Sequence, residues 1–436
     1  MIQSAVFIVL LTAAVYWFTK NVRKIARNIH LGQKREKYDQ VGERWKNVFL
    51  IAFGQTKMMV RPIPGILHFF VYAGFVIINL EVLEIIIDGV AGTHRVFAPL
   101  GSLYDALIAS FEVLAFLVLA ACVVFMIRRN VLKIQRFTKP ELQGFPSTDA
   151  NLILITEVLL MSAFLFMNAA DGILQSRGVE HYIQAGSFPI SGFLQPLLQG
   201  WSDGALIALE RSTWWFHIVG ILLFLNYLPY SKHLHIVLAF PATWYGNLKP
   251  KGQFSNDENV MREVQLMLDP SADPYAAPAS DQPIVFGAKD VRDLNFKSLM
   301  DAYSCTECGR CTSVCPANQT GKKLSPRKIL MDTRDRLDEV GKGIDQHGAD
   351  YRDNKQLLGD YITEEELWAC TTCNACTDAC PINLDPLAVI MDLRRNLVME
   401  ESKAPGSLMA MFSNIENNAA PWQFAQSDRL NWKDEQ

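Results

Sequence analysis

Eight cysteines between residues 305 and 380 constrain the fold of this 436-residue chain more than any other feature. They repeat the pattern C-x-x-C-x-x-C-x-x-x-C-P twice. Three thiolates spaced in this way can curl round one face of an iron–sulfur cluster, while the fourth points elsewhere. The two patterns therefore predict two [4Fe-4S] clusters. The cysteines are Cys305, Cys308, Cys311, Cys315, Cys370, Cys373, Cys376 and Cys380.

The spacing also predicts which cysteines share a cluster. Where two such patterns occur together, the fourth cysteine of each pattern ligates the other cluster. This crossing would tie the two segments into one small domain despite the long insert between them. The expected ligand sets are Cys305, Cys308, Cys311 and Cys380 for one cluster, and Cys370, Cys373, Cys376 and Cys315 for the other.

Structural zinc and disulfides are the alternative interpretations of these cysteines. Zinc sites usually contain paired C-x-x-C motifs with a wider gap between them. Disulfides are not expected if this part of the chain faces a reducing cytosol. The remaining cysteine, Cys122, lies in an apolar stretch and is interpreted as a small apolar residue.

Five apolar stretches in the first 240 or so residues predict a transmembrane bundle, because each approaches the ~20 residues that cross a bilayer. The first is interpreted as a true span rather than a signal peptide, since residues 1–15 carry no positive charge and no convincing cleavage site. From Lys249 onward the chain is polar. The stretches cover approximately residues 2–18, 66–87, 107–127, 152–170 and 206–228.

Lysine and arginine predict the orientation of the bundle. They are concentrated in the loops 20–61 and 128–136, whereas the loops around Arg95 and at 171–203 are poor in them. Basic loops remain in the cytoplasm. The N-terminus is therefore expected outside and the cysteines in the cytosol, with the chain in the cytoplasmic membrane. The net charge of −4 gives no reason to expect nucleic-acid binding.

Three histidines in or next to the spans are candidate axial ligands of haem b. If one helix continues from His217 to His235, the 18 residues between them make five turns, so both lie on one face about 27 Å apart. His233 would then lie on another face. His68 is expected at the same depth as His235, but a pairing of His68 with His217 remains open, as does one haem or two. The alternative is histidines bonded to backbone carbonyls.

Four glutamates also fall within the predicted spans: Glu81, Glu84, Glu112 and Glu157. Ionisable groups inside a membrane are functional candidates by default. They are interpreted either as proton relays or quinone contacts, or as side chains paired inside the bundle.

The sequence resembles known redox proteins in two regions. HIVGILLFLNYLPYSKHLH (217–235) and GILHFFVYAGF (65–75) resemble the last and the second span of the respiratory nitrate reductase gamma subunit and of the membrane subunit of heterodisulfide reductase. The segments 286–326 and 366–386, which carry the cysteines, resemble iron–sulfur subunits of heterodisulfide reductase and its quinone-linked relatives. The positions ten residues from His68, where the gamma subunit has a second histidine, hold Met58 and Ile78.

The expected architecture is all-α, with a five-helix transmembrane domain (1–245), a linker (246–285), a cytosolic ferredoxin domain (286–400) and a polar tail (401–436). Helices are predicted at 260–268, 325–337, 362–368 and 386–399. The resemblance implies a membrane electron-transfer subunit that links a quinone to a separate cytosolic flavoprotein or cysteine-rich subunit. The alternatives are a redox sensor or assembly anchor, and electron transfer coupled to proton pumping.

Overall fold

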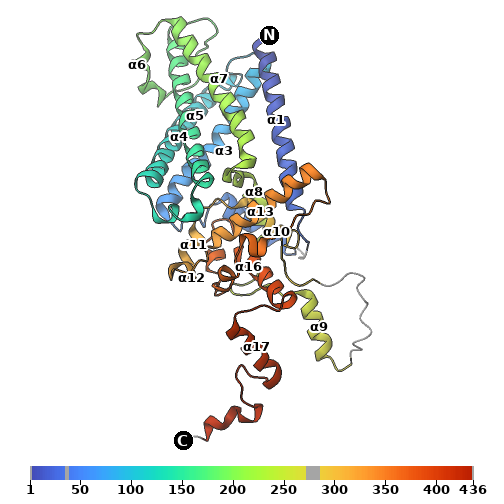
Figure 1. The fold of residues 1–436 in the computed structure, drawn as a ribbon. Helices are drawn as coiled ribbons and strands as arrows, with labels where there is room; N and C mark the ends of the chain where they lie inside the picture. Colours follow the sequence, from blue (N-terminus) through green and yellow to red (C-terminus); the bar gives the residue numbers. More distant parts are fainter. Residues whose placement is uncertain (1, 35–38, 272–284, 435–436) are drawn as a thin grey trace. The chain divides into compact units, whose positions relative to one another are not determined.

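The computed structural model describes residues 2–34, 39–271 and 285–434. These residues form helices and no strand, apart from two isolated backbone bridges, so the all-α prediction is confirmed. They fall into two compact units (Figure 1). The first unit draws on residues 1–27, 40–245 and 303–309, and the second on 28–39, 246–302 and 310–436.

Five helices are long and apolar enough to cross a membrane, as the five apolar stretches predict. Their spans contain 28 to 32 residues, and at ~1.5 Å per residue each exceeds the ~30 Å thickness of a bilayer core. The polar flanks of the apolar stretches continue these helices. The helices are α1 (Ile2–Ile29), α3 (Pro62–Ala91), α4 (Ser102–Met126), α5 (Phe145–Ser176) and α7 (Asp203–Tyr227).

Local sequence sets the ends of these helices. Pro62 opens α3, where its missing N–H is not needed, and Gly92 closes it in the left-handed conformation at φ 74°. At the start of α7, the Ser202 hydroxyl accepts a hydrogen bond from the amide of Ala205 at 3.4 Å. Shorter helices of this unit are α2 (Val41–Asn47), α6 (Gln195–Leu198) and α8 (His235–Trp244).

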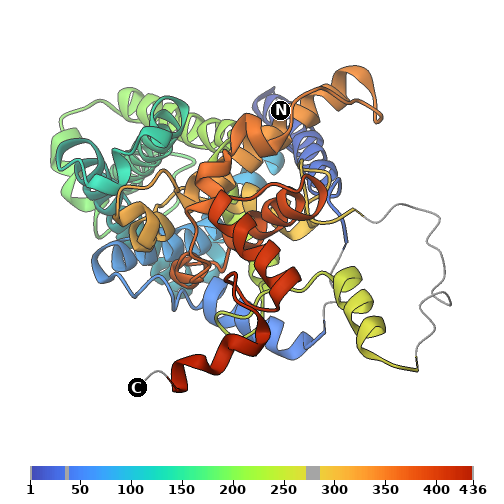
Figure 2. The same ribbon diagram turned by 60° about the horizontal axis from the view of Figure 1, so that its bottom comes forward.

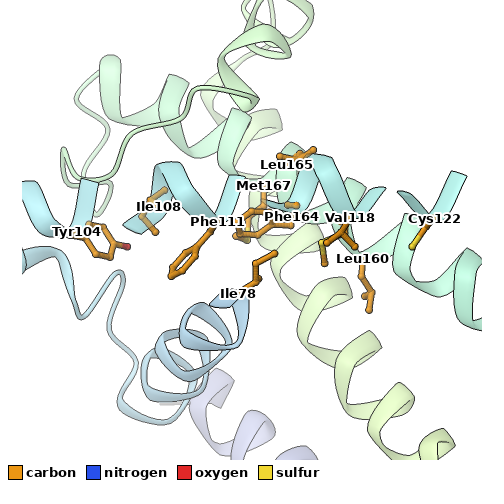
Figure 3. Close-up of a cluster of buried hydrophobic side chains, with 12 residues drawn as sticks. Ile78, Tyr104, Ile108, Phe111, Val118, Cys122, Leu160, Phe164, Leu165 and Met167 are labelled. Atoms are coloured by element: carbon orange, nitrogen blue, oxygen red, sulfur yellow. The ribbon is translucent and has the colours of Figure 1, made fainter. Parts of the chain in front are cut away.

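A cluster of buried apolar side chains joins α3, α4 and α5 (Figure 3). Ile108 and Phe164 are fully buried in it, and Cys122 is 1% exposed. Glycines allow the close approach of neighbouring helices. A Cβ atom at Gly74 would lie 2.4 Å from Cγ2 of Val118, and one at Gly220 would lie 2.6 Å from Cδ2 of Leu160.

Helix α13 (Pro326–His347) is the longest of the second unit and packs against α16 (Pro386–Arg395) (Figures 1 and 2). The Ser325 hydroxyl accepts a hydrogen bond from the Lys328 amide at 3.4 Å. The predicted helix start at this position is therefore confirmed, but the helix continues well beyond the predicted end, to His347. The remaining helices are α9 (Glu258–Leu268), α10 (Phe296–Ser304), α11 (Arg310–Val314), α12 (Pro316–Gln319), α14 (Glu364–Trp368), α15 (Ala375–Ala379) and α17 (Gly406–Asn418).

Arg336 fixes two loops onto α13. Its guanidinium is buried and donates hydrogen bonds to Asp290 at 2.8 and 2.9 Å, and to Asp353 at 2.6 and 2.8 Å. A guanidinium that bonds two carboxylates bidentately holds both in a fixed geometry. The long insert between the cysteine motifs is therefore an ordered part of the unit.

Helix α14 begins with the predicted capping box. The Thr363 hydroxyl accepts from the Glu366 amide at 3.3 Å, and the Glu366 carboxylate accepts from the Thr363 amide at 3.0 Å. Beyond α16 the chain forms a π-helical turn, Asn396–Glu400, and then α17. The tail aromatics Trp422, Phe424 and Trp432 are 52%, 63% and 69% exposed.

Candidate functional site

The two cysteine loops share one backbone conformation despite their different side chains. The residue before the second cysteine and the residue after it have positive φ angles in both loops: 56° and 71° at Glu307 and Gly309, and 56° and 61° at Thr372 and Asn374. Non-glycine residues seldom adopt this conformation. Such turns allow the chain to wind tightly between successive cysteines.

The fourth cysteine of each motif is also placed alike. Cys315 and Cys380 have φ/ψ angles of −71°/118° and −69°/128°, the extended conformation that a following proline favours. The amide of each donates at 3.3 Å to a carbonyl of its own loop, that of Thr312 or Thr377. Helices α11 and α15, which each contain a third cysteine and end directly before a fourth, pack against one another.

One predicted ligand set lies entirely within the second unit, and other thiols of the set contribute to the raised pKa of two of its members. Burial is the main cause that raises the pKa of the Cys370 thiol, and the neighbouring Cys315 and Cys373 raise it further. Burial, with a smaller contribution from Cys370, raises the pKa of Cys376 to about 12. The Thr372 amide donates to the Cys370 sulfur at 3.4 Å. These four cysteines fit a shared iron–sulfur cluster, which would supply the positive charge that thiolates require.

The other predicted set is divided between the units. Cys305 and Cys308 belong to the first unit, and Cys311 and Cys380 to the second. Among the residues that the structure describes, no three His, Cys, Asp or Glu side chains converge to hold a single metal ion. In a cubane each cysteine binds its own iron, so its thiols surround a cluster rather than one ion.

The structure brings His68 of α3 and His235 of α8 together, with ring centres 6.4 Å apart. His233 joins them, at 5.5 Å from His235. The single helix from His217 to His235 that the spacing argument assumes is absent, because the chain leaves the helix at Ser231, at φ −112° and ψ 150°. The argument that placed His217 and His235 on one face, and His233 on another, therefore does not hold.

Asp149 of α5 explains the break after α7. Its carboxylate accepts hydrogen bonds from the Tyr227 hydroxyl at 2.6 Å, the Ser231 hydroxyl at 2.7 Å and the Lys232 amide at 3.1 Å. Pro229, which has no N–H, lies between them. The carboxylate thus provides a hydrogen-bond acceptor for the Lys232 amide, which forms no helical hydrogen bond at this point.

The closeness of the His68 and His235 rings would allow both to bind one iron. Two imidazoles with metal–nitrogen bonds of about 2 Å each would have ring centres about 6 Å apart. Nδ1 of His235 lies 3.1 Å from the Lys232 carbonyl oxygen, so Nδ1 donates and Nε2 keeps its lone pair. Burial also lowers the pKa of His235, which favours the neutral form that binds metal.

His217 lies apart from this pair. Its Nδ1 donates to the Leu160 carbonyl at 3.0 Å, and its ring centre is 5.9 Å from that of Phe164. The alternative pairing of His68 with His217 is thus not the one that the structure brings together.

A comparison with protein families agrees with the iron–sulfur interpretation of the two cysteine motifs. The stretch 304–384 matches the family described as the 4Fe-4S dicluster domain. Residues 304–384 are a dicluster domain of this kind. No solved structure matches the chain.

Curated relatives extend the similarity beyond the dicluster domain. A probable iron-sulfur-binding oxidoreductase of Bacillus subtilis is 30% identical over all of this chain and 61% of its own length. An EtfAB:quinone oxidoreductase of Syntrophomonas wolfei is 26% identical over 91% of this chain and 55% of its own length. One component of a CoB-CoM heterodisulfide reductase from Methanosarcina acetivorans is 33% identical over 24% of this chain and 52% of its own length. The chain thus spans little more than half the length of the curated relatives that it matches.

One contact of the dicluster domain lies within the first unit and was not foreseen. The Lys232 ammonium forms an ion pair with Glu307, which lies between Cys305 and Cys308, and also donates to the Pro146 carbonyl at 2.7 Å. Asp149 lies 3.9 Å away. The same turn that carries His233 and His235 therefore binds the first cysteine loop.

A second feature is a buried polar network centred on Arg95, in the loop between α3 and α4. Glu84 and Glu112 are paired within it, as one of the two interpretations of the glutamates expected, but the role of Arg95 was not predicted. Its guanidinium donates to Asp171 at 2.7 Å, to the Tyr104 hydroxyl at 2.9 Å and to Asn168 at 3.2 Å. The sequence placed Arg95 in a loop poor in basic residues. We call this set the Arg95 network, and it comprises Glu84, Asp88, Arg95, Tyr104, Glu112, Asn168 and Asp171.

The signal that could have revealed this network is the spacing of acids in α3. Glu81, Glu84 and Asp88 lie three and four residues apart, which places them on one helix face. All three are buried, at 4%, 4% and 9% exposed. An acidic face inside an apolar span requires polar partners on the neighbouring helices.

Proposed function

We propose that this chain is a membrane-anchored electron-transfer subunit of a quinone-linked oxidoreductase. Electrons would pass between a membrane quinone and a cytosolic redox partner, by way of haem b in the bundle and the two [4Fe-4S] clusters. The observation that carries the proposal is the presence, in one chain, of a dicluster domain, five helices able to cross a membrane and the His68–His235 pair.

In this proposal the cysteines hold the clusters in the crossed arrangement. One set is Cys305, Cys308, Cys311 and Cys380, and the other is Cys315, Cys370, Cys373 and Cys376. The closeness of Cys370 to Cys315 and Cys373, and of Cys376 to Cys370, supports the assignment of the second set. The matching backbone of the two loops supports the same role for both.

His68 and His235 are the proposed axial ligands of haem b, which when bound supplies a one-electron carrier within the bundle. The Lys232 carbonyl orients the His235 ring through Nδ1. His217 is assigned to a second haem only if the protein binds two, and its own Nδ1 is held by the Leu160 carbonyl.

The proposed topology follows the basic loops, with the N-terminus outside and the dicluster domain in the cytosol of the cytoplasmic membrane. The names of two relatives support the proposed partners. One joins EtfAB with a quinone, and the other belongs to a heterodisulfide reductase. A cytosolic flavoprotein or cysteine-rich subunit is therefore the proposed partner on the soluble side.

The test is to purify the protein in mild detergent, assay haem and non-haem iron, and record visible spectra before and after addition of a quinol analogue. We expect about eight non-haem irons per chain for two cubanes, and a haem b band that appears with quinol. His235→Ala should lose that band and keep the iron. His347→Ala, a surface histidine stacked on Tyr351, is the matched control and should keep both.

The opposite results separate the alternatives. Iron without haem would make the histidines structural, and would favour a redox sensor or assembly anchor. Haem that quinol does not reduce would remove the quinone link from the proposal.

A further inference from the structure

The buried end of the bundle around the Arg95 network contains more carboxyl groups than cations. Six carboxyl side chains there are no more than 9% exposed, against the buried Arg95 and the half-buried Arg211. An unbalanced set of charges in a low-dielectric region carries a large desolvation cost. Part of this set therefore holds protons. The six are Glu81, Glu84, Asp88, Glu112, Asp171 and Glu210.

Most of these carboxylates receive hydrogen bonds that stabilise the ionised form. Glu84 accepts from the Phe97 amide at 2.8 Å and the Tyr104 hydroxyl at 2.9 Å. Glu112 accepts from Asn168 at 3.1 Å and from the amides of residues 190 and 191 at 2.9 and 3.1 Å. Asp171 is paired with Arg95.

Asp88 and Glu210 also receive hydrogen bonds that stabilise the ionised form. Asp88 accepts from the Thr93 hydroxyl at 2.5 Å and from the Arg95 amide at 2.7 Å. Glu210 accepts from the Tyr182 hydroxyl at 3.0 Å and is paired with Arg211. Five of the six carboxylates are thus provided with donors.

Glu81 differs from the other five. Its Oε2 is buried and has no hydrogen-bond partner among the residues that the structure describes. The charged groups that face it are Glu84 on its own helix, Arg95 in the loop, Glu112 on α4 and Asp171 on α5. Three of these four are acids, which oppose a negative charge at Glu81. The single cation, Arg95, favours that charge but is already bonded to Asp171. Burial also opposes the charge, and no hydrogen-bond donor among the described residues reaches Oε2 to offset it.

Polar side chains also lie between this region and the loops at the same end of the bundle. The Tyr104 hydroxyl lies between Glu84 and Arg95. His94, which directly precedes Arg95 in the sequence, has a buried Nδ1 without a partner in the described part of the chain. Its ring centre is 5.1 Å from that of His181, whose side chain is exposed. A titratable side chain in contact with water therefore lies next to His94.

We propose that Glu81 is a proton-carrying site, which holds a proton at neutral pH and exchanges it with the aqueous side reached by the loops 92–101 and 177–194. This rests on the proposed function for its source of protons. Oxidation of one quinol gives one quinone, two electrons and two protons. The electrons leave towards the clusters. Glu81 first releases its own proton from Oε2 towards His94 and His181, and then takes up one of the two quinol protons at Oε2, while the other quinol proton passes to water.

The first test detects the proton directly and needs neither quinone nor turnover. Infrared difference spectra of the purified protein, recorded as the pH is raised from neutral, should show loss of a protonated carboxyl band. Glu81→Gln should lack this band. Glu112→Gln, which removes a carboxylate with three N–H donors, is the control and should retain it. Glu81→Asp should restore a band at a shifted frequency.

A band that persists in Glu81→Gln, or is missing from the wild type, would overturn the proposal. If Glu81→Gln does not accumulate, the same decision rests on the shifted band of Glu81→Asp. The frequency of the carboxyl band in Glu81→Asp must differ from that of the wild-type band if residue 81 carries the proton.

The second test measures protons released per electron in proteoliposomes supplied with a quinol analogue and an external electron acceptor. Glu81→Gln should lower this ratio while quinol still reduces the haem in detergent. An unchanged ratio would contradict the proton route. If quinol fails to reduce the wild type while the infrared band is present, the proposed function fails and the proton site stands.

Discussion

Lys232 is a single residue whose surroundings join the histidine turn to the first cysteine loop. Its side chain is 10% exposed and that of Glu307 is 3% exposed. Removal of one partner from a buried ion pair leaves the other charge uncompensated. Lys232 therefore has a structural role that its position in a basic flank of the last span does not suggest.

We expect Lys232→Met to reduce the free energy of unfolding by about 3 to 5 kcal/mol, because it leaves Glu307 and Asp149 without their shared cation. The measurement is the midpoint of thermal unfolding in detergent, together with iron content. Lys323→Met is the control, since its pair with Glu365 is 69% and 62% exposed and should contribute little. Equal effects of the two substitutions would contradict this interpretation.

Asp301 gives a prediction for pH. Burial raises its pKa to about 6, against the opposing effect of the Lys297 ammonium, and its Oδ2 accepts from the Asp385 amide at 3.0 Å. Because the folded-state pKa lies above the unfolded value, the folded state binds this proton more tightly. Its contribution to stability is thus complete below pH 3.8 and is lost as the pH rises through 6.

Asp301→Asn should therefore flatten the loss of stability between about pH 4 and 7 relative to the wild type. Thermal unfolding in buffers across this range measures the difference. Asp335→Asn, at an exposed position on α13, is the control. Parallel pH profiles for Asp301→Asn and the wild type would show that this carboxyl does not titrate in that range.

Single residues also show where sequence reasoning stops. The cysteine spacing and the capping box of Thr363 and Glu366 are local patterns, and both predicted local structure. The association of His233 with His68 and His235 depends on the break at Ser231. A side chain on another helix, that of Asp149, stabilises that break. No periodicity within the last span contains this information.

At the scale of helices, two glycines face neighbouring side chains that differ in how easily they can move. A Cβ at Gly74 would meet Cγ2 of Val118 at 2.4 Å, and one at Gly220 would meet Cδ2 of Leu160 at 2.6 Å. Val118 is β-branched and 3% exposed, so its rotamer is constrained. Leu160 presents the end of a longer side chain, which can move.

Gly74→Ala should accordingly destabilise the bundle by about 1 to 3 kcal/mol through overpacking, whereas Gly220→Ala should cost less. Thermal unfolding in detergent compares the two directly. A larger effect at Gly220 would contradict the argument from side-chain mobility.

Among the features of the helices, some could be predicted from the sequence and others could not. The five apolar stretches are recognised from length and composition alone, and each lies in a helix long and apolar enough to cross a membrane. The Arg95 network requires partners from α3, α4, α5 and one loop. Its members become neighbours only when the helices pack, so hydropathy records them as isolated polar residues.

For the whole molecule, the proposed topology makes a direct prediction. In intact cells, a membrane-impermeant thiol reagent should label Glu180→Cys, in an exposed loop expected outside, and should not label Met59→Cys, in a loop expected in the cytosol. Permeabilised cells provide the control, because both sites should then react. The reverse pattern would invert the proposed orientation.

The proposed domain boundaries at residues 245, 285 and 400 stay predictions. The two compact units are discontinuous in sequence and do not coincide with these domains, since residues 303–309 belong to the first unit and 310 onward to the second. A motif with continuous sequence is thus divided by its contacts, a property that composition along the chain does not reveal.

The matching loops of the dicluster domain repeat a backbone shape rather than a sequence. Positive φ angles occur at Glu307 and Gly309 in one loop, and at Thr372 and Asn374 in the other. When the main chain determines the shape of a loop, the side chains of that loop can differ. The side chains around each proposed cluster can therefore change in evolution while the backbone that carries the cysteines keeps its conformation.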